Sequence, residues 1–194
     1  MAMDKRIVKT KNNIKQTLIK MLGYKKFEEI TVKELCDQAQ TSRITFYTHY
    51  SDKSELAEEI FEDMQLRAKE EYHKLQSENN PSGDIVCDYL NILDSILNVY
   101  YSNYDFFCHT KANESPALNY MYFKVIDETI SEKVEKDNER LSPRYPLSMT
   151  CDFITSGIKG FINAGRREGL GGEEIRPMAR ELLKRLLENE VVRK

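Results

Sequence analysis

Three helix starts follow one another closely between Thr31 and Asp52, and this crowding constrains the fold more than any other feature of the sequence. Thr31-Val-Lys-Glu34 matches a capping box, in which the Thr31 hydroxyl accepts a hydrogen bond from the amide of Glu34 and the Glu34 carboxylate accepts one from the amide of Thr31. Ser42 can cap a second helix and Asp52 a third. The segment therefore predicts two very short helices and a longer one, with Gln40-Thr-Ser42 as the tight turn of a helix-turn-helix.

The apolar residues of this segment recur at helical spacing, so each helix is expected to bury one side. Ala39 is small at the point where two crossing helices must approach each other. The residues expected to face inward are Val32, Leu35, Cys36, Ala39, Phe46, Tyr50 and Leu56. The outward positions after Ser42 hold Arg43, Thr45, Tyr47 and Thr48, whose side chains suit contacts with base edges and phosphates.

The rest of the chain also has helical periodicity, and its few glycines and prolines fall between the periodic segments, so the predicted fold class is all-α. We expect about nine helices. A small three-helix head (residues 1–52) is followed by a long fourth helix that leads into a larger helical body (residues 53–194). Besides the two short helices, the predicted helices cover 5–22, 52–75, 84–102, 104–112, 116–140, 146–168 and 173–191, with a loop at 78–83.

Composition excludes several classes of protein. With 40% hydrophobic and 31% charged residues the chain is expected to be globular, and it has neither an apolar run of about 18 residues nor a signal peptide, so a cytoplasmic protein without membrane contact is expected. We expect no metal, no cofactor, no disulfide and no enzyme, because the cysteines, histidines and serines lack ligand or nucleophile-base spacing. The cysteines, read as buried thiols, are Cys36, Cys87, Cys108 and Cys151, and the histidines are His49, His73 and His109.

The net charge of -3 hides an asymmetry between the two ends of the chain. Residues 1–50 hold 10 Lys and Arg against 5 Asp and Glu, a net charge of +5, whereas residues 51–194 hold 19 against 27, a net charge of -8. A basic head suits a polyanion such as nucleic acid, because neutralising phosphates releases counterions. The alternative is a charged helix face that only meets solvent.

The stretch Ser42-Arg-Ile-Thr-Phe-Tyr-Thr-His-Tyr-Ser-Asp-Lys53 resembles the N-terminal domain of the TetR family of transcriptional regulators. The resemblance covers about residues 10–60, and beyond them only helix number and length are similar. It implies a recognition helix at 42–48 that binds double-stranded DNA, with phosphate contacts from Tyr47, His49 and Lys53. The full set of expected DNA-binding residues is Thr41, Ser42, Arg43, Thr45, Tyr47, Thr48, His49 and Lys53, of which Thr41, Arg43 and Thr45 are the candidates for base edges.

Several of these residues have an alternative interpretation, and three positions depart from the family pattern. Tyr47 could be packing, His49 a core or capping histidine, and Lys53 a solvated residue of a first helical turn. Gln40 stands where family members usually have glycine, so a left-handed backbone there would be strained. Ile44 replaces a small residue and Thr48 a basic one, so non-specific affinity is expected from Lys53, Lys9, Lys11 and neighbouring lysines.

In the body, aromatic side chains and a stripe of small residues suggest two further sites. Aromatic residues can line a cavity for an unknown small-molecule effector, although most of them must be core. The candidates for that pocket are Tyr89, Tyr100, Phe106, Phe107, Tyr120, Phe123 and Phe153. The last two predicted helices carry a face of small and apolar residues, and the resemblance implies that this face pairs with a second copy in a homodimer. The interface candidates are Gly157, Gly160, Phe161, Ala164, Met178, Leu182 and Leu186. The alternative is that both stripes pack only within one chain.

Taken together, the sequence and the resemblance predict a repressor that binds a palindromic operator as a dimer and is released by a small-molecule effector. The alternative is a constitutive DNA-binding regulator without such a ligand, controlled by a protein partner or by its abundance.

Overall fold

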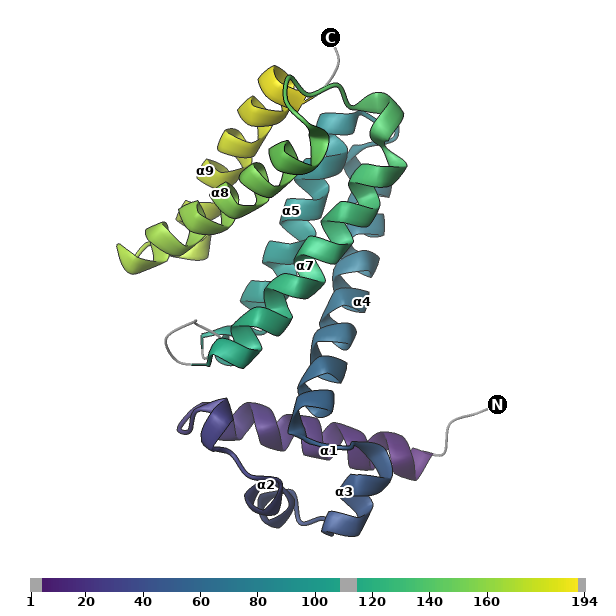
Figure 1. Cartoon of the computed structure of the whole chain (residues 1–194), viewed down its shortest axis with the longest axis vertical. Helices are drawn as coiled ribbons and strands as arrows, with labels where there is room; N and C mark the ends of the chain where they lie inside the picture. The colour runs from purple at the N-terminus through teal and green to yellow at the C-terminus, as the bar shows by residue number, and fades with distance from the viewer. Residues whose placement is uncertain (1–4, 109–114, 192–194) are drawn as a thin grey trace. The chain divides into compact units, whose positions relative to one another are not determined.

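The computed structural model describes residues 5–108 and 115–191. Within these residues the chain forms nine α-helices and no strand, which confirms the all-α prediction (Figure 1). The described residues divide into two compact units. The first unit comprises Met1–Gln65 and Asn103–Val125, and the second comprises Leu66–Ser102 and Ile126–Lys194, each as far as it is described.

The first unit is built on the head helices. Ile14 and Leu18 on the first helix are fully buried, as are Leu35, Phe46 and Leu56. The unit extends past residue 52, the expected end of the head, because Leu56, Ile60 and Phe61 of the fourth helix bury their side chains in it. Its helices are α1 (Lys5–Leu22), α2 (Val32–Gln38), α3 (Arg43–His49), the first turns of α4 (Lys53–Asn79), α6 (Tyr104–Phe107) and the first turns of α7 (Pro116–Lys136), with a 3-10 turn at Phe27–Glu29.

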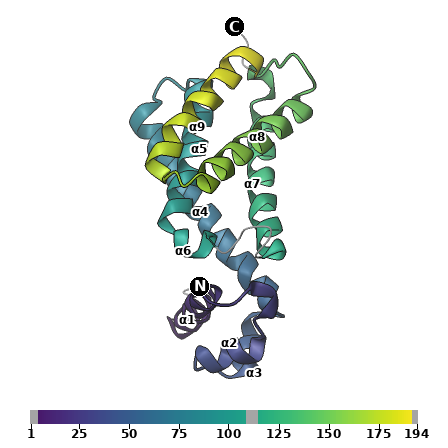
Figure 2. The same cartoon turned by 90° about the vertical axis from the view of Figure 1, so that its left-hand side faces the viewer.

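The second unit contains the later turns of α4 and α7 together with α5 (Ile85–Ser102), α8 (Leu147–Arg167) and α9 (Gly172–Leu186). α9 packs against both α5 and α8 (Figure 2). The core of this unit joins Leu93 and Leu97 of α5 to Ile158 of α8 and to Ala179 and Leu183 of α9. Apolar residues three or four positions apart on each helix thus meet in one cluster, as their spacing predicts.

Several helix ends differ from the prediction. α4 continues through Asn79 into the expected loop, where Asn80 bonds back to it through its amide, which donates to the carbonyl of Gln76 at 3.1 Å. α7 ends at Lys136 and a separate 3-10 turn follows at Asn138–Arg140, and a π-helical turn at Leu187–Val191 continues α9. The predicted helix 104–112 is α6 at Tyr104–Phe107, and its remainder lies mostly outside the described residues, as does His109.

The expectation that all four cysteine thiols are buried is wrong. Cys36 is buried in the first unit, whereas Cys87, Cys108 and Cys151 are half-buried. Among residues 5–108 and 115–191, no cluster of three or more His, Cys, Asp or Glu side chains could hold a metal ion. No helix of the same residues is long and apolar enough to cross a membrane.

Candidate nucleic-acid interface

The turn between α2 and α3 sets the geometry of the candidate interface. The capping box forms as expected: the Glu34 amide donates to the Thr31 hydroxyl at 3.2 Å, and the Thr31 amide donates to the Glu34 carboxylate at 3.0 Å. At the other end of α2, Gln40 adopts a left-handed conformation with φ 50°, the one positive φ among the described non-glycine residues. The next amide, that of Thr41, then donates to the Cys36 carbonyl at 3.0 Å. Four residues, 39–42, separate α2 from α3, and they include the predicted turn Gln40-Thr-Ser42.

α3 has a buried side and an exposed side. Phe46 and Tyr50 are buried, with their ring centroids 5.5 Å apart. On the opposite side Arg43 and Thr48 are exposed, the Ile44 side chain is 83% exposed and that of Tyr47 is 57% exposed. α3 therefore presents a cation, a branched alkyl group and a phenol to solvent from a firmly packed helix.

Three hydroxyls predicted to contact DNA are engaged within α3. The Ser42 hydroxyl caps the helix by accepting a hydrogen bond from the Thr45 amide at 3.0 Å, and it lies 2.8 Å from the Thr45 hydroxyl. Thr48 donates its hydroxyl hydrogen to the Ile44 carbonyl at 2.8 Å. Thr41 lies half-buried in the turn. The hydroxyls of Ser42 and Thr48 thus bond to the backbone of their own segment.

Lys53 has a structural engagement that the sequence did not reveal. Its ammonium group donates to the carbonyls of Phe27 at 2.6 Å, Ile30 at 2.7 Å and Glu28 at 3.0 Å, and lies 4.7 Å from the centroid of the Phe27 ring. Burial lowers the pKa of Lys53. This side chain therefore ties the start of α4 to the 3-10 turn before α2, and the expected phosphate contact would have to compete with three carbonyls.

The positive charge of the head is partly neutralised within the unit. Lys11 pairs with Glu59 at 2.5 Å, and Lys15 pairs with Asp63 at 2.5 Å and with Glu59 at 2.6 Å. Lys25 pairs with Glu34 at 2.7 Å. Lys11 is thus paired with a carboxylate of α4, whereas Lys9, Lys33 and Arg43 lie exposed. His49, the remaining predicted phosphate contact, is half-buried at the end of α3 with its ring centroid 6.4 Å from that of Tyr50.

The seven predicted pocket residues are divided between the two units. Phe106 and Phe107 are buried in the first unit, where their rings lie 5.3 and 6.5 Å from that of Phe61, while Tyr89 and Tyr100 belong to the second unit. Tyr120 is 70% exposed and Phe153 is 72% exposed, so neither lines a closed cavity within its unit. Phe123 is half-buried on α7, with its ring 4.9 Å from that of Tyr122.

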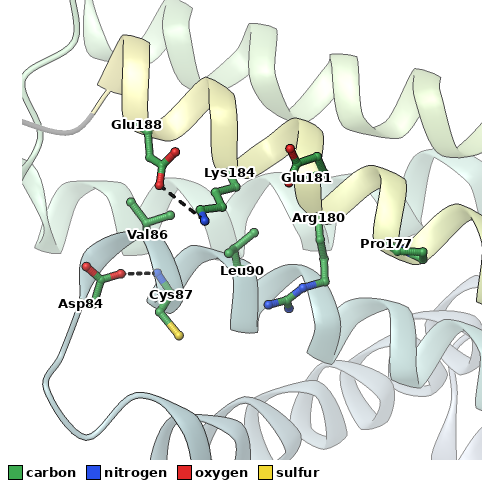
Figure 3. A pocket seen from close by; sticks show the side chains of 9 residues that line it. All are labelled: Asp84, Val86, Cys87, Leu90, Pro177, Arg180, Glu181, Lys184 and Glu188. Carbon is green, nitrogen blue, oxygen red and sulfur yellow. Dashed lines mark hydrogen bonds and ion pairs between the residues drawn. The ribbon is translucent and has the colours of Figure 1, made fainter.

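A shallow groove of about 560 Å³ lies between the first turns of α5 and the exposed edge of α9 (Figure 3). Its charged groups are mostly engaged with one another: Arg180 pairs with Asp94, Lys184 lies 3.8 Å from Glu188, and Asp84 accepts the amide of Cys87 at 2.7 Å. None of the predicted aromatic residues lines this groove, whose walls are Asp84, Val86, Cys87, Leu90, Pro177, Arg180, Glu181, Lys184 and Glu188.

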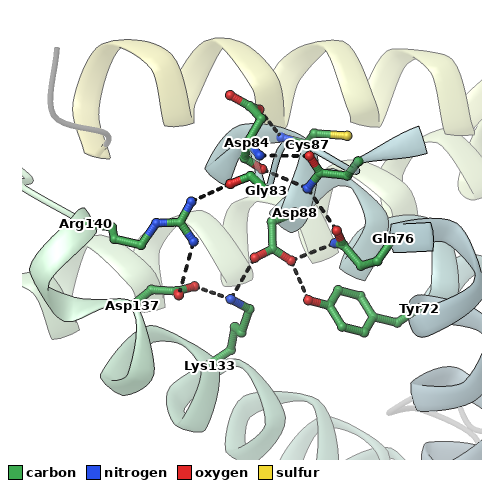
Figure 4. Close-up of polar contacts among 10 residues, drawn as sticks. Tyr72, Gln76, Gly83, Asp84, Cys87, Asp88, Lys133, Asp137 and Arg140 are labelled. Carbon is green, nitrogen blue, oxygen red and sulfur yellow. Dashed lines mark hydrogen bonds and ion pairs between the residues drawn. The ribbon is translucent and has the colours of Figure 1, made fainter. Parts of the chain in front are cut away.

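A buried polar network connects α4, α5 and α7 in the second unit (Figure 4). Asp88 accepts hydrogen bonds from the Tyr72 hydroxyl at 2.5 Å, from Gln76 at 2.7 Å and from Lys133 at 2.8 Å. Lys133 also pairs with Asp137. Burial, and then the bond to Asp88, raise the pKa of Tyr72. Because the buried charges are paired, the network serves to fix these helices together.

The predicted dimerisation face lies on α8 and α9 and is open in the single chain. A methyl group built on Gly157 or on Gly160 would meet no atom within 4 Å. Met149 is 65% exposed on the same helix, and Met178 of α9 is also exposed. The other predicted interface residues, Phe161, Ala164, Leu182 and Leu186, are half-buried. Packing within the second unit therefore does not explain Gly157 and Gly160, whereas Gly165 of the same helix lies close to Ile175.

Comparison with known proteins agrees with this architecture. No model of a protein family matches the chain. A curated relative, an uncharacterized HTH-type transcriptional regulator of Bacillus subtilis (strain 168), is 35% identical over 51 residues, which are 26% of this chain and 13% of that protein. The match therefore spans only a small part of the relative.

Solved structures are similar over nearly the whole chain. A TetR-family regulator from Syntrophomonas wolfei has a TM-score of 0.76 at 14% identity, with 93% of this chain and 96% of that chain covered. TetR regulators from Streptococcus agalactiae (TM-score 0.63, 20% identity, 93% and 96% covered) and from Shewanella sp. PV-4 (TM-score 0.62, 17% identity, 95% and 99% covered) are also similar. The chain therefore has the fold of TetR-family transcriptional regulators.

Proposed function

We propose that this chain, which has the TetR-family fold, is a transcriptional regulator that binds double-stranded DNA through α3. One observation carries the proposal: α3 follows a four-residue turn, buries Phe46 and Tyr50, and projects Arg43, Ile44 and Tyr47 outward. A short, rigid helix presented in this way fits the major groove, where side chains reach base edges. The resemblance of residues 42–53 and the shared fold support the same function.

The exposed cations around α3 supply the electrostatic part of this binding. Arg43 on α3, Lys33 on α2 and Lys9 on α1 are exposed, whereas Lys11, Lys15 and Lys53 are engaged inside the first unit. Phosphate contacts then come from the first set together with Tyr47, because a phenol can donate to a phosphate oxygen. We expect affinity for duplex DNA to fall steeply as salt is raised.

We further propose that the chain acts as a homodimer on a palindromic operator. The open face of α8 and α9 fits a second copy, since the glycines leave room for a helix to approach closely and exposed Met149, Phe153 and Met178 would be covered. Glycine inside a helix costs about 1 kcal/mol relative to alanine, and close approach of a partner helix offsets that cost. Two recognition helices would then read half-sites about 34–36 Å apart.

The DNA-bound dimer is proposed to repress transcription and to be released when the body binds a small-molecule effector. Of the residues predicted to line the effector pocket, Tyr89 and Tyr100 lie on α5 in the second unit. The exposure of Tyr120 and Phe153 favours the alternative, a constitutive regulator controlled by a protein partner or by abundance. A thermal-shift screen of metabolites and cationic drugs separates the two, because a ligand that binds the native state raises the unfolding temperature.

The DNA-binding proposal is tested by selecting bound duplexes from a random pool and measuring their Kd against salt. Arg43→Ala and Tyr47→Ala are expected to weaken binding by at least about tenfold each. Tyr145→Ala removes an equally exposed tyrosine from the second unit and serves as the matched control. Failure of the pool to yield a bound sequence, or unchanged Kd in both α3 variants, would contradict the proposal.

A further inference from the structure

Ile44 is the most exposed of the large apolar side chains in the described structure, at 83%, and it lies on the side of α3 proposed to face DNA. Neither helix formation nor core packing explains a large apolar residue at this exposed position. A β-branched residue is a weaker helix former than alanine, and an exposed alkyl group gains nothing from burial. The side chain does not contribute to the packing of the first unit, which leaves the proposed DNA interface as the place where it can act.

Few polar side chains near Ile44 are available to recognise a base. Thr48 donates its hydroxyl hydrogen to the Ile44 carbonyl at 2.8 Å, and the hydroxyls of Ser42 and Thr45 lie 2.8 Å apart at the helix start. With the hydroxyls of α3 largely engaged in this way, the outward side chains that remain are Arg43, Ile44 and Tyr47. Of these, Ile44 offers only alkyl surface.

We infer that Ile44 contacts the 5-methyl group of a thymine in the major groove of each operator half-site. The inference rests on the proposed function and adds a base identity to it. Thymine is the one DNA base with an apolar group on its major-groove edge. The same alkyl group disfavours other bases, because a donor or acceptor covered by isoleucine loses its water without gaining a partner.

The size of the effect follows from burial of one methyl group. Removing it from contact with an alkyl side chain is expected to weaken binding about fourfold per half-site. In a dimer that reads both half-sites, the symmetric change is expected to weaken binding about fifteenfold. Both effects lie within the range of an equilibrium titration.

The test replaces thymine by deoxyuridine, which pairs in the same way but lacks the 5-methyl group. Starting from the duplex selected above, each thymine is replaced symmetrically in both half-sites, and Kd is measured by fluorescence anisotropy for the wild type, Ile44→Ala and Leu66→Ala. We expect one thymine position at which deoxyuridine raises the Kd of the wild type about fifteenfold and that of Ile44→Ala by less than about twofold. Leu66, an apolar residue of α4 that is 59% exposed, is the matched control, and its variant should keep the full wild-type penalty.

The outcomes are distinguishable. Tight binding by the wild type with no thymine in the half-site, or with deoxyuridine tolerated at every position, overturns the role of Ile44 and leaves the DNA-binding proposal standing. A penalty that is equal in the wild type and in Ile44→Ala also overturns it, since the methyl group would then contact another residue. If the wild type binds no duplex at all, the proposed function fails and the inference fails with it.

Discussion

At the scale of single residues, Gln40 and Lys53 act on the stability of the head in opposite directions. The backbone of Gln40 is strained in the tight turn, and Lys53 ties the start of α4 to the 3-10 turn before α2. Gln40 has φ 50°, a conformation that brings the Cβ of an L-residue close to the following carbonyl. The turn needs it, because only then does the Thr41 amide reach the Cys36 carbonyl at 3.0 Å. The helix pair therefore carries local strain at the position where glycine would carry none.

Replacing Gln40 by glycine should consequently stabilise the protein. The strain removed is about 1–2 kcal/mol and the added entropy of the unfolded chain opposes it, so we expect a net gain of about 0.5–1 kcal/mol in the free energy of unfolding. Urea denaturation at equilibrium measures it. Gln38→Gly is the control, since Gln38 is the last residue of α2 and its replacement should lower stability. A loss of stability in Gln40→Gly would show that the turn is not strained.

Lys53 should matter more for folding than for DNA. Lys53→Met keeps an apolar chain over Phe27 but removes the hydrogen bonds to three carbonyls, so we expect it to lower the free energy of unfolding by about 2 kcal/mol. Lys26→Met, at an exposed lysine of the same turn, should change it by less than about 0.5 kcal/mol.

The salt dependence of DNA binding tests whether Lys53 contacts a phosphate. Each phosphate contact contributes about one unit to the slope of log Kd against log salt concentration. We expect Lys53→Met to leave that slope unchanged and Arg43→Gln to reduce it by about one. A reduced slope in Lys53→Met would restore the phosphate contact that the family resemblance implies.

The outward positions of the interface residues could be predicted from the sequence, but the interaction partners of the lysines could not. The outward placement of Arg43, Thr48 and Tyr47 follows from helical spacing alone. That Lys53 would bond to carbonyls some 25 residues earlier in the chain depends on the tertiary fold, which no local pattern encodes. The same holds for Lys11, whose partner Glu59 lies on another helix.

At the scale of elements, helix starts are defined by side chains of their own, and α2 is the clearest case. The Glu34 carboxylate accepts hydrogen bonds from the Thr31 amide at 3.0 Å and the Thr31 hydroxyl at 2.8 Å, and pairs with Lys25 at 2.7 Å. The bond from Lys25 first, and then those from Thr31, lower the pKa of Glu34 to about 2. The start of α2 therefore depends on an ionised carboxylate.

This dependence gives stability a pH signature. A carboxylate with a lowered pKa stabilises the folded state fully above its unfolded value of 4.5, and its contribution is lost as pH falls toward about 2. We expect Glu34→Gln to be less stable than the wild type at pH 7, with the difference shrinking between pH 4.5 and pH 2. Carbon NMR of the Glu34 carboxyl would report the midpoint directly. Glu29→Gln, an exposed carboxylate nearby, should show no such convergence.

The start of α9 is sensitive in another way, because a Cβ at Gly172 would lie 2.6 Å from Cζ of Tyr101. The Tyr101 ring packs edge-on against that of Tyr100 at 5.2 Å and cannot move freely. We expect Gly172→Ala to lower the melting temperature, with a loss of about 1–3 kcal/mol. Gly171→Ala is the matched control, since its nearest contact would be the Glu174 carboxylate at 3.7 Å; equal losses in both variants would argue against crowding by Tyr101.

Helix starts were predicted better than helix ends. Thr31, Ser42 and Asp52 each accept the hydrogen bonds that their sequence positions predict. The end of α4 was placed four residues early, because Gln76 and Asn79 gain partners on α5, namely Asp88 and Asn91. A cap is local and can be recognised in the sequence, whereas a helix that ends by packing against another one cannot.

At the scale of the whole molecule, the order of helices was predictable and the grouping of distant segments was not. The early turns of α7 join the first unit: the Glu28 carboxylate accepts hydrogen bonds from the Ser115 hydroxyl at 3.2 Å and the Ala117 amide at 3.3 Å. These partners are 87 and 89 residues apart in sequence. The predicted pocket residues are divided between the two units for the same reason, since a shared aromatic character does not say which residues are neighbours.

The open face of α8 makes the oligomeric state the decisive property of the whole molecule. In a lone chain, Gly160→Leu meets no atom near its Cβ and exchanges glycine for a good helix former, so it should stabilise the second unit by about 1 kcal/mol. In the proposed dimer the same leucine would separate the two copies. We therefore expect sedimentation equilibrium to show a monomer for Gly160→Leu where the wild type is a dimer, together with a loss of operator affinity. Ser148→Leu, at an exposed position on another side of α8, should remain dimeric, and a dimeric Gly160→Leu would place the interface elsewhere.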